Sequence, residues 1–321
     1  MKKFFYLSVV LLGGLVVGSC SGDDDDDNGG GKGSSSAGVI DSRQGILLKS
    51  VDNFRFFYTD NGRLDYFTED NRDRYEMGSN TINFVNEDGE EEEIELKYNG
   101  SGFLTTIKDS YSFTEERLTV NFSGKATLSY DGSGHLTKIS LSSTEKGVED
   151  GKSYTETSTN NISFSWRSNL LTSVESLWKE VEDENVYTGS EWYHYEYNDA
   201  ALENNVNKYC QYAPSIVRWG EDLWRALAYV GMLGVGPNCL PSGCEYGYED
   251  YEDGKLDEEY KNTESYRYQF NSDGTLSVCY RGSRSYNFSY YYMNADARAT
   301  RSGADLAKSM RSLFRRHAKG A

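Results

Sequence analysis

The sequence has few of the residues that most enzymes use for chemistry. Its 321 residues include only three histidines, which lie far apart at His135, His194 and His317. Nothing resembles a nucleophile elbow, and the close Cys-x-x-Cys pairs that zinc sites favour are absent. We therefore expect no metal, no cofactor and no enzymatic activity.

Proline is equally scarce, and its distribution bears on the fold. All three prolines, Pro214, Pro237 and Pro241, fall within one stretch of 28 residues. Because proline removes a hydrogen bond from a β-ladder, it is confined to edges and turns. The rest of the chain is free of this obstacle to sheet formation.

Positive charge is also in deficit. The 33 basic residues are outnumbered by 51 acidic residues, which gives a formal charge of −18. An acidic chain of this kind repels phosphate backbones, so nucleic acid is excluded as a partner. Aromatic residues are plentiful, at 14% with 26 tyrosines, which argues against a disordered or collagen-like chain.

The N-terminus has the pattern of a secretory signal peptide. Lys2 and Lys3 precede an apolar run over 4–17, which is shorter than the roughly 20 residues of a membrane-spanning helix. The sequence Val-Gly-Ser-Cys that ends at Cys20 resembles the lipobox of bacterial lipoproteins, where the peptidase cuts before a cysteine that carries diacylglycerol. We predict a lipoprotein signal peptide over 1–19 and a lipid anchor on Cys20. The alternative is an ordinary cleaved signal.

Residues 20–40 are predicted to form a flexible tether. Five adjacent aspartates at 23–27 repel one another, and the glycines and serines that follow cannot bury a core. An acidic run close behind a lipidated cysteine resembles the surface-export signal of Bacteroidetes lipoproteins. That resemblance implies a lipid-anchored outer-membrane protein exposed at the cell surface; the alternative is a solvated spacer.

From about residue 41 onward, apolar and polar residues alternate as in β-strands that bury one face. A recurring unit joins these strands, with an aromatic residue six positions before a leucine and a glycine two before that leucine. It occurs at 58–64, 98–104, 130–136 and 270–276. The glycine supplies the positive φ of a tight hairpin turn. The pattern predicts an all-β antiparallel meander of hairpins.

One substantial helix is predicted inside this sheet. Ser215 is a good N-cap, and apolar residues follow at helical spacing up to Val230, before a glycine-rich end. We expect a helix over 215–233 within an insertion at 200–241, with a shorter helix or irregular loop at 200–209. The apolar stripe of the main helix should pack on the sheet or plug an open end of it.

A single domain is expected over 41–293, followed by a tail at 294–321. The tail carries seven basic and two acidic residues, and its apolar residues over 305–317 repeat at helical spacing. The spacing predicts a basic amphipathic helix, either solvated or in contact with a membrane surface or partner.

Together, the hairpin units, the aromatic-rich alternation, the late helical insertion and the lipoprotein start resemble a Bacteroidetes family of lipoproteins of unknown function with a porin-like fold. The resemblance covers about 46–292 and implies an antiparallel sheet rolled into a barrel, without implying an activity. The strand at 90–97 carries five glutamates, which would be costly against lipid. We therefore expect a soluble barrel with its aromatic face inward and a polar, acidic outer face.

Four cysteines besides Cys20 remain after signal removal. An even set outside the cytosol favours disulfides, and Cys239 with Cys244 would close a small loop, which leaves Cys210 to pair with Cys279. Free thiols are the next alternative, and metal ligation is the last.

The most unusual local feature is an acidic, tyrosine-rich segment at 245–260, interpreted as a loop. Tyr246, Tyr248, Tyr251 and Tyr260 are the candidate binding residues, because tyrosine combines a flat apolar face with a hydroxyl and suits sugar rings or protein partners. Calcium is a weak alternative, since the spaced ligands of an EF-hand loop are missing. A solvated hairpin without a ligand is the other alternative.

These features predict a non-enzymatic, cell-surface lipoprotein that binds a glycan or a protein through its loops and outer face. A structural or envelope-assembly lipoprotein is the alternative. A third hypothesis is a glycan hydrolase that uses acidic residues of the barrel rim.

Overall fold

The computed structural model describes residues 46–60, 62–70, 72–86, 89, 91–115, 118–182, 185–198 and 222–292. Several predictions concern residues outside these ranges: the signal peptide, Cys20, the tether, the segment 200–209, Cys210 and the basic tail.

The described residues form sixteen β-strands and one α-helix, and the strands fall into two length classes. Eight strands have five to nine residues: β1 (Ile46–Val51), β2 (Phe54–Tyr58), β3 (Leu64–Glu69), β4 (Asp73–Met77), β5 (Thr81–Val85), β6 (Glu91–Tyr98), β15 (Leu276–Arg281) and β16 (Arg284–Tyr292). Eight have 10 to 16 residues: β7 (Leu104–Glu115), β8 (Leu118–Tyr130), β9 (Leu136–Glu149), β10 (Lys152–Arg167), β11 (Leu170–Glu182), β12 (Asn185–Glu196), β13 (Gly243–Glu252) and β14 (Lys255–Phe270). Helix α3 (Asp222–Tyr229) lies between β12 and β13 in the chain.

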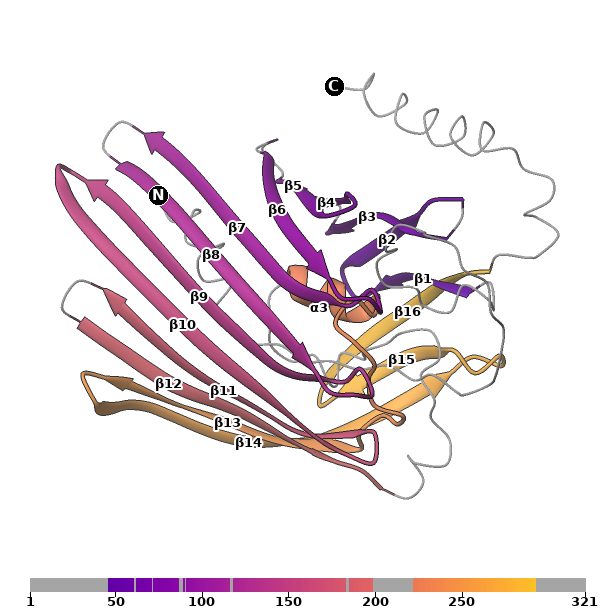
Figure 1. Ribbon diagram of the computed structural model, residues 1–321. Coiled ribbons are helices and arrows are strands. Elements are labelled where there is room, and N and C mark those ends of the chain that lie inside the picture. Colours follow the sequence, from indigo (N-terminus) through magenta and orange to yellow (C-terminus); the bar gives the residue numbers. More distant parts are fainter. Residues whose placement is uncertain are drawn as a thin grey trace.

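The strands close into a barrel. Each strand pairs antiparallel with its neighbour in sequence, and β1 pairs with β16, where Ile46 lies opposite Tyr292. Figure 1 shows the long strands sweeping out on one side, beyond the short strands opposite. The predicted all-β meander rolled into a barrel is confirmed.

The recurring hairpin unit has one backbone geometry at all four sites. At 130–136, the Asp131 N–H donates to the His135 carbonyl oxygen at 2.9 Å, and the Gly134 N–H donates to the Asp131 carbonyl oxygen at 3.1 Å. Gly134 has a φ of 84°, which favours glycine. The other three sites repeat both bonds, and the aromatic residue pairs with the leucine across a register shift. The predicted turns are confirmed.

Aromatic residues also tie the two strands of a hairpin together at the end opposite its turn. In each case, the aromatic residue lies at the end of the second strand and donates to the carbonyl oxygen of a leucine at the start of the first. The pairs are Tyr130 with Leu104 at 2.5 Å, Trp166 with Leu136 at 2.8 Å, and Tyr197 with Leu171 at 2.8 Å. These aromatic residues therefore fix the strand ends at one end of the barrel.

Around the plug, the barrel turns its apolar side chains inward and its polar side chains outward. Along β8, the buried residues are Val120, Phe122, Ala126 and Leu128, and the exposed ones are Asn121, Ser123, Lys125 and Thr127. On β6, the outward residues Glu91, Glu93 and Glu95 are all exposed. The burial pattern agrees with the expected apolar inner face and polar outer face.

Helix α3 lies inside the barrel, as Figure 1 shows, and shares one core with inward side chains of the strands. Leu227 and Tyr229 are fully buried. The helix ends in a Schellman motif: the Gly231 N–H donates to the Ala228 carbonyl oxygen at 2.9 Å, and the Met232 N–H donates to the Leu227 carbonyl oxygen at 3.0 Å. Its C-terminal end therefore comes earlier than the predicted residue 233; the expected 215–221 portion lies outside the described residues.

The segment after α3 crosses the barrel end at which the recurring turns lie. It makes four backbone hydrogen bonds to the strand ends and turns there. The bonds are Leu104 N to Met232 O at 3.0 Å, Val235 N to Gly134 O at 2.9 Å, Asn238 N to Asn169 O at 2.9 Å, and Ser242 N to Glu196 O at 2.7 Å. Residues 222–242, here called the plug, therefore close one end of the barrel.

Candidate functional site

Away from the plug, the inward face of the long strands changes from apolar to polar. Directly opposite residues of paired antiparallel strands share a face, so the strand registers define rows across the sheet. From the plug outward, the rows are Phe164, Val174, Tyr193, Tyr246 and Asn262; Ile162, Ser176, Glu191, Tyr248 and Tyr260; Asn160, Trp178, Gly189, Asp250 and Glu258; and Ser158, Glu180, Tyr187, Glu252 and Lys255. A further row holds Glu145, Glu156 and Glu182. These five rows are called the inner wall.

Four tyrosines of the inner wall form a connected group, here called the tyrosine platform: Tyr193, Tyr246, Tyr248 and Tyr260. Tyr193 and Tyr246 stack with ring centroids 6.0 Å apart, and Tyr248 and Tyr260 stack at 5.6 Å. Tyr246 and Tyr260, 5.9 Å apart, join the two pairs. Tyr193 is only 4% exposed, whereas Tyr260 is 43% exposed. The platform is therefore anchored in the core at one end and open to solvent at the other.

Polar groups hold the rings of the tyrosine platform and lie beside them. The Tyr248 hydroxyl donates to Glu258 Oε1 at 2.5 Å, and this bond, followed by burial and the carboxylate charge, raises the pKa of Tyr248 to about 12. Asn262 Nδ2 donates to the Tyr246 hydroxyl at 3.1 Å. Glu258 and Asn262 are both exposed. Flat ring faces next to solvent-accessible carboxylate and amide groups can contact both faces and hydroxyls of a ligand.

The rest of the inner wall is rich in carboxylates that repel one another. Burial, then the charges of Glu180, Glu145 and Glu182, raise the pKa of Glu156 to about 7. Burial and the charges of Glu258 and Asp257 raise the pKa of Asp250. Desolvation and like charge both disfavour the ionised form of a carboxyl group.

The segment at 245–260 is a β-hairpin, as in the alternative interpretation, rather than the predicted loop. Residues 245–252 of β13 pair with β12 on one side and with β14 on the other, residues 255–260 of β14 pair with β13, and residues 253 and 254 form the turn. Because side chains alternate along a strand, the hairpin separates the four candidate tyrosines. Tyr246, Tyr248 and Tyr260 come together on the inner wall, whereas Tyr251 lies on the outer face, where its hydroxyl donates to Glu249 at 2.8 Å.

Trp178 is a residue of the inner wall that the sequence analysis did not select. An added Cβ on Gly189 would lie 2.5 Å from Trp178 Cε2 and 2.6 Å from Asp250 Oδ1, so indole ring and carboxylate meet over this glycine. Two signals in the sequence could have identified Trp178: the period-two alternation of β11, and Gly189, the glycine opposite it on β12.

The cysteines stay a matter of prediction. Cys239, Cys244 and Cys279 are buried, and the Cys244 thiol donates to the Glu245 carbonyl oxygen at 3.3 Å. Burial raises the pKa of Cys239. Cys210 lies outside the described residues. The predicted pairs Cys239 with Cys244 and Cys210 with Cys279 therefore await a chemical test.

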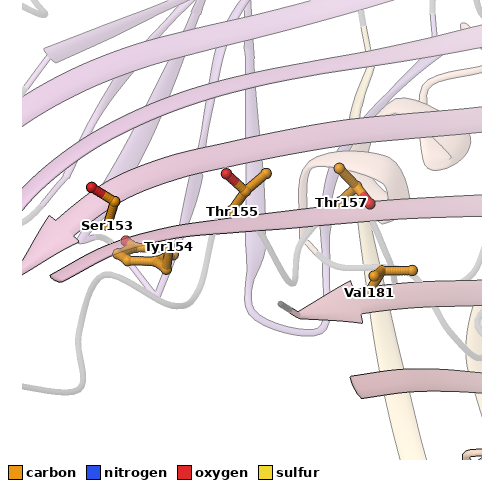
Figure 2. A pocket seen from close by; sticks show the side chains of 5 residues that line it. All are labelled: Ser153, Tyr154, Thr155, Thr157 and Val181. Atoms are coloured by element: carbon orange, nitrogen blue, oxygen red, sulfur yellow. The ribbon is translucent and has the colours of Figure 1, made fainter. Parts of the chain in front are cut away.

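A hollow lies beside β10 and β11, near the tip of the β9–β10 hairpin. Figure 2 shows its lining residues Ser153, Tyr154, Thr155, Thr157 and Val181 on β10 and β11. It encloses about 320 Å³ and is open to solvent. It offers hydroxyls but no carboxylate or basic group, so it is less suited to specific chemistry than the inner wall. Within the described ranges, no group of three or more His, Cys, Asp or Glu residues could hold a metal ion.

The fold and the site define a closed sixteen-strand β-barrel, plugged at one end, with a polar and aromatic inner wall on its long strands. No family model and no curated protein matches the chain. The structure is similar to a porin-like protein from Bacteroides vulgatus ATCC 8482, with 12% identity and a TM-score of 0.47, covering 76% of this chain and 98% of that chain. It is also similar to a porin-like protein from Bacteroides uniformis ATCC 8492, with 13% identity and a TM-score of 0.24, covering 65% of this chain and 92% of that chain.

In the part of the chain that the structure describes, no helix has the length and apolar character needed to cross a membrane.

Proposed function

We propose that this protein is a cell-surface lipoprotein that binds a saccharide on its inner wall and does not catalyse a reaction. The observation that carries the proposal is the tyrosine platform, which is open to solvent at one end. The exposed side chains of Glu258 and Asn262 lie beside its rings. A sugar ring has an apolar face that stacks on an aromatic ring, and hydroxyls that bond to carboxylate and amide groups.

Two rings of the tyrosine platform are held in place by hydrogen bonds, which supports the platform as a binding site. Tyr248 is held by Glu258, and Tyr246 accepts from Asn262, so both rings are oriented before a ligand arrives. Side chains that are already ordered lose less conformational freedom on binding. The rings also stand on paired β-strands, which hold side chains more rigidly than a loop does.

The proposed display at the outer membrane rests on Cys20 and on the closure of the barrel. Ile46 and Tyr292 pair where β1 and β16 meet, at the plug end of the barrel. A lipid anchor on Cys20 would be joined through the predicted tether to the start of β1, at that end of the barrel. The exposed glutamates on the outer face of β6 would be costly against lipid, so they favour a barrel whose outer face contacts water.

A glycan array probed with the full mature chain tests the proposal. We expect binding to at least one class of saccharide, and we expect Tyr260→Ala and Tyr248→Ala to weaken it by about tenfold or more. The matched control is Tyr251→Ala, which changes a tyrosine of the same hairpin on the outer face and should leave binding intact.

Three outcomes would count against the proposal. If no saccharide binds, a structural or envelope-assembly role becomes the better account. If Tyr251→Ala weakens binding as much as Tyr260→Ala, the inner wall is not the site. Release of reducing ends from any polysaccharide by the purified protein would overturn the non-enzymatic assignment.

A further inference from the structure

The charged side chains of the inner wall carry one sign almost throughout. Carboxylates occur in every row except the one nearest the plug, and Lys255 at a hairpin tip is the only basic residue in the five rows. Three other basic residues of the same strands, Lys146, Lys179 and Lys261, lie opposite the outward residues Thr155, Thr188 and Gly247. Lys152, opposite Glu149, lies beyond the outermost row at the tip of the β9–β10 hairpin. The five rows of the wall therefore form a negatively charged surface.

Three carboxylates of the wall have no basic partner in the part of the chain that the structure describes. Among the described residues, no ion pair includes Glu156, Glu180 or Asp250. Their pKa values are all raised, with burial as the largest cause and neighbouring carboxylates as the next. Like charges held this close destabilise each other, and a bound cation would relieve the repulsion. A neutral ligand would leave that repulsion in place.

Aromatic rings lie next to these carboxylates. Trp178 and the carboxylate of Asp250 meet over Gly189, and the stacked rings of Tyr248 and Tyr260 occupy the next row towards the plug. An ammonium group is attracted both to a carboxylate and to the face of an indole or phenol ring. A ligand with sugar rings and ammonium groups would therefore meet complementary partners in adjacent rows.

We propose that the inner wall binds an amino-sugar oligomer, whose rings stack on Tyr260 and Tyr248 and whose protonated amino groups lie against Asp250 and Glu180. This inference rests on the proposed function and narrows it, because it names the charge of the saccharide. The charge complementarity of the wall selects this ligand over a neutral or acidic glycan.

The test compares two ligands of the same sugar ring, one with free, charged amino groups and one with acetylated, neutral amino groups. Calorimetric titration of the full mature chain at about pH 6 would use a glucosamine oligomer and an N-acetylglucosamine oligomer of equal length. We expect the amino form to bind about tenfold more tightly, with the difference shrinking at high salt because surface charges are screened. Asp250→Asn and Glu180→Gln should each weaken binding of the amino form about threefold or more. Glu249→Gln, the neighbouring change on the outer face, should leave it unchanged.

The outcomes separate this inference from the proposed function. Equal or tighter binding of the acetylated oligomer would overturn the amino-sugar assignment and leave saccharide binding standing. Binding of neither oligomer, with binding of another saccharide on the array, overturns the inference alone, whereas no binding of any saccharide overturns both. If oligolysine binds as tightly and Tyr260→Ala has no effect on either ligand, the wall recognises polycations in general, which also overturns the inference.

Discussion

Replacing Glu92 with glutamine should flatten the dependence of stability on pH. Glu92 on β6 and Asp109 on β7 form a carboxyl pair on the inward face, outside the inner wall. Asp109 is only 7% exposed, and its buried Oδ1 has no hydrogen-bond partner among the described residues. Burial, then the hydrogen bond to Asp109 and its charge, raise the pKa of Glu92 to about 9, and burial raises the pKa of Asp109. The folded protein therefore keeps a proton on this pair at neutral pH.

The sign of the effect follows from proton linkage. Glu92 in the unfolded chain loses its proton near its ordinary pKa of 4.5, whereas the folded protein keeps it until about pH 9. The contribution to stability is therefore complete below the lower pKa and is lost progressively as the pH rises between the two. One unit of pKa shift corresponds to about 1.4 kcal/mol. Because Glu92 is only half-buried and solvent screens its charge, we expect the free energy of unfolding to fall by about 2 kcal/mol over the whole pH interval.

Urea denaturation at about pH 5 and about pH 9, followed by tryptophan fluorescence, measures this effect as a difference between proteins. Wild type should lose about 2 kcal/mol more unfolding free energy over that interval than Glu92→Gln, which cannot titrate. Glu93→Gln, an exposed neighbour on the outer face of β6, should follow the wild-type profile. If Glu92→Gln and wild type lose the same amount, the carboxyl pair is not protonated as argued.

Three further perturbations address the plug, the strand ends and the anchor. Leu227→Ala, at a fully buried position of α3, should lower the free energy of unfolding by about 2–5 kcal/mol in urea denaturation, and a negligible loss would show that the plug is not part of the core. Tyr130→Phe, which removes the bond to the Leu104 carbonyl, should cost about 1–2 kcal/mol in the same assay. Tyr251→Phe, on the outer face, should cost less than about 0.5 kcal/mol, and equal losses would contradict a special role for Tyr130. Cys20→Ala should abolish metabolic labelling with a palmitate analogue, and retained labelling would exclude the predicted lipoprotein.

Local features of the fold were predictable because neighbouring residues specify them. The turn at 130–136 needs a positive φ at Gly134 and an acceptor such as Asp131, and both are visible in the sequence. The C-terminal end of α3 was harder to predict, because several glycines follow the helix. Only the hydrogen bonds of the Schellman motif show that Gly231 is the one that ends it.

The candidate site was predictable in part. Tyr246, Tyr248 and Tyr260 were selected for their residue type, and their grouping needed the register of β13 with β14. The loop assignment for 245–260 was wrong and the hairpin alternative was right, because the local pattern of charges does not show the pairing of β13 with β12 and β14. Alternation along β13 would have placed Tyr251 on the other face, once the segment was taken as a strand.

The sequence by itself determined the strands and the hairpin turns, and it predicted a helix that includes α3 and a lipid anchor on Cys20, because alternation, turn glycines and signal patterns act over a few residues. The tertiary structure alone decided the closure of β1 on β16, the placement of α3 inside the barrel, and the assembly of Trp178, Asp250 and the tyrosine platform on one face. These depend on pairings between residues far apart in the chain, whose register no local pattern records. The scarcity of histidine led to the prediction of a non-enzymatic protein, and the strand registers placed Glu180, Glu191 and Asp250 on one wall of the barrel.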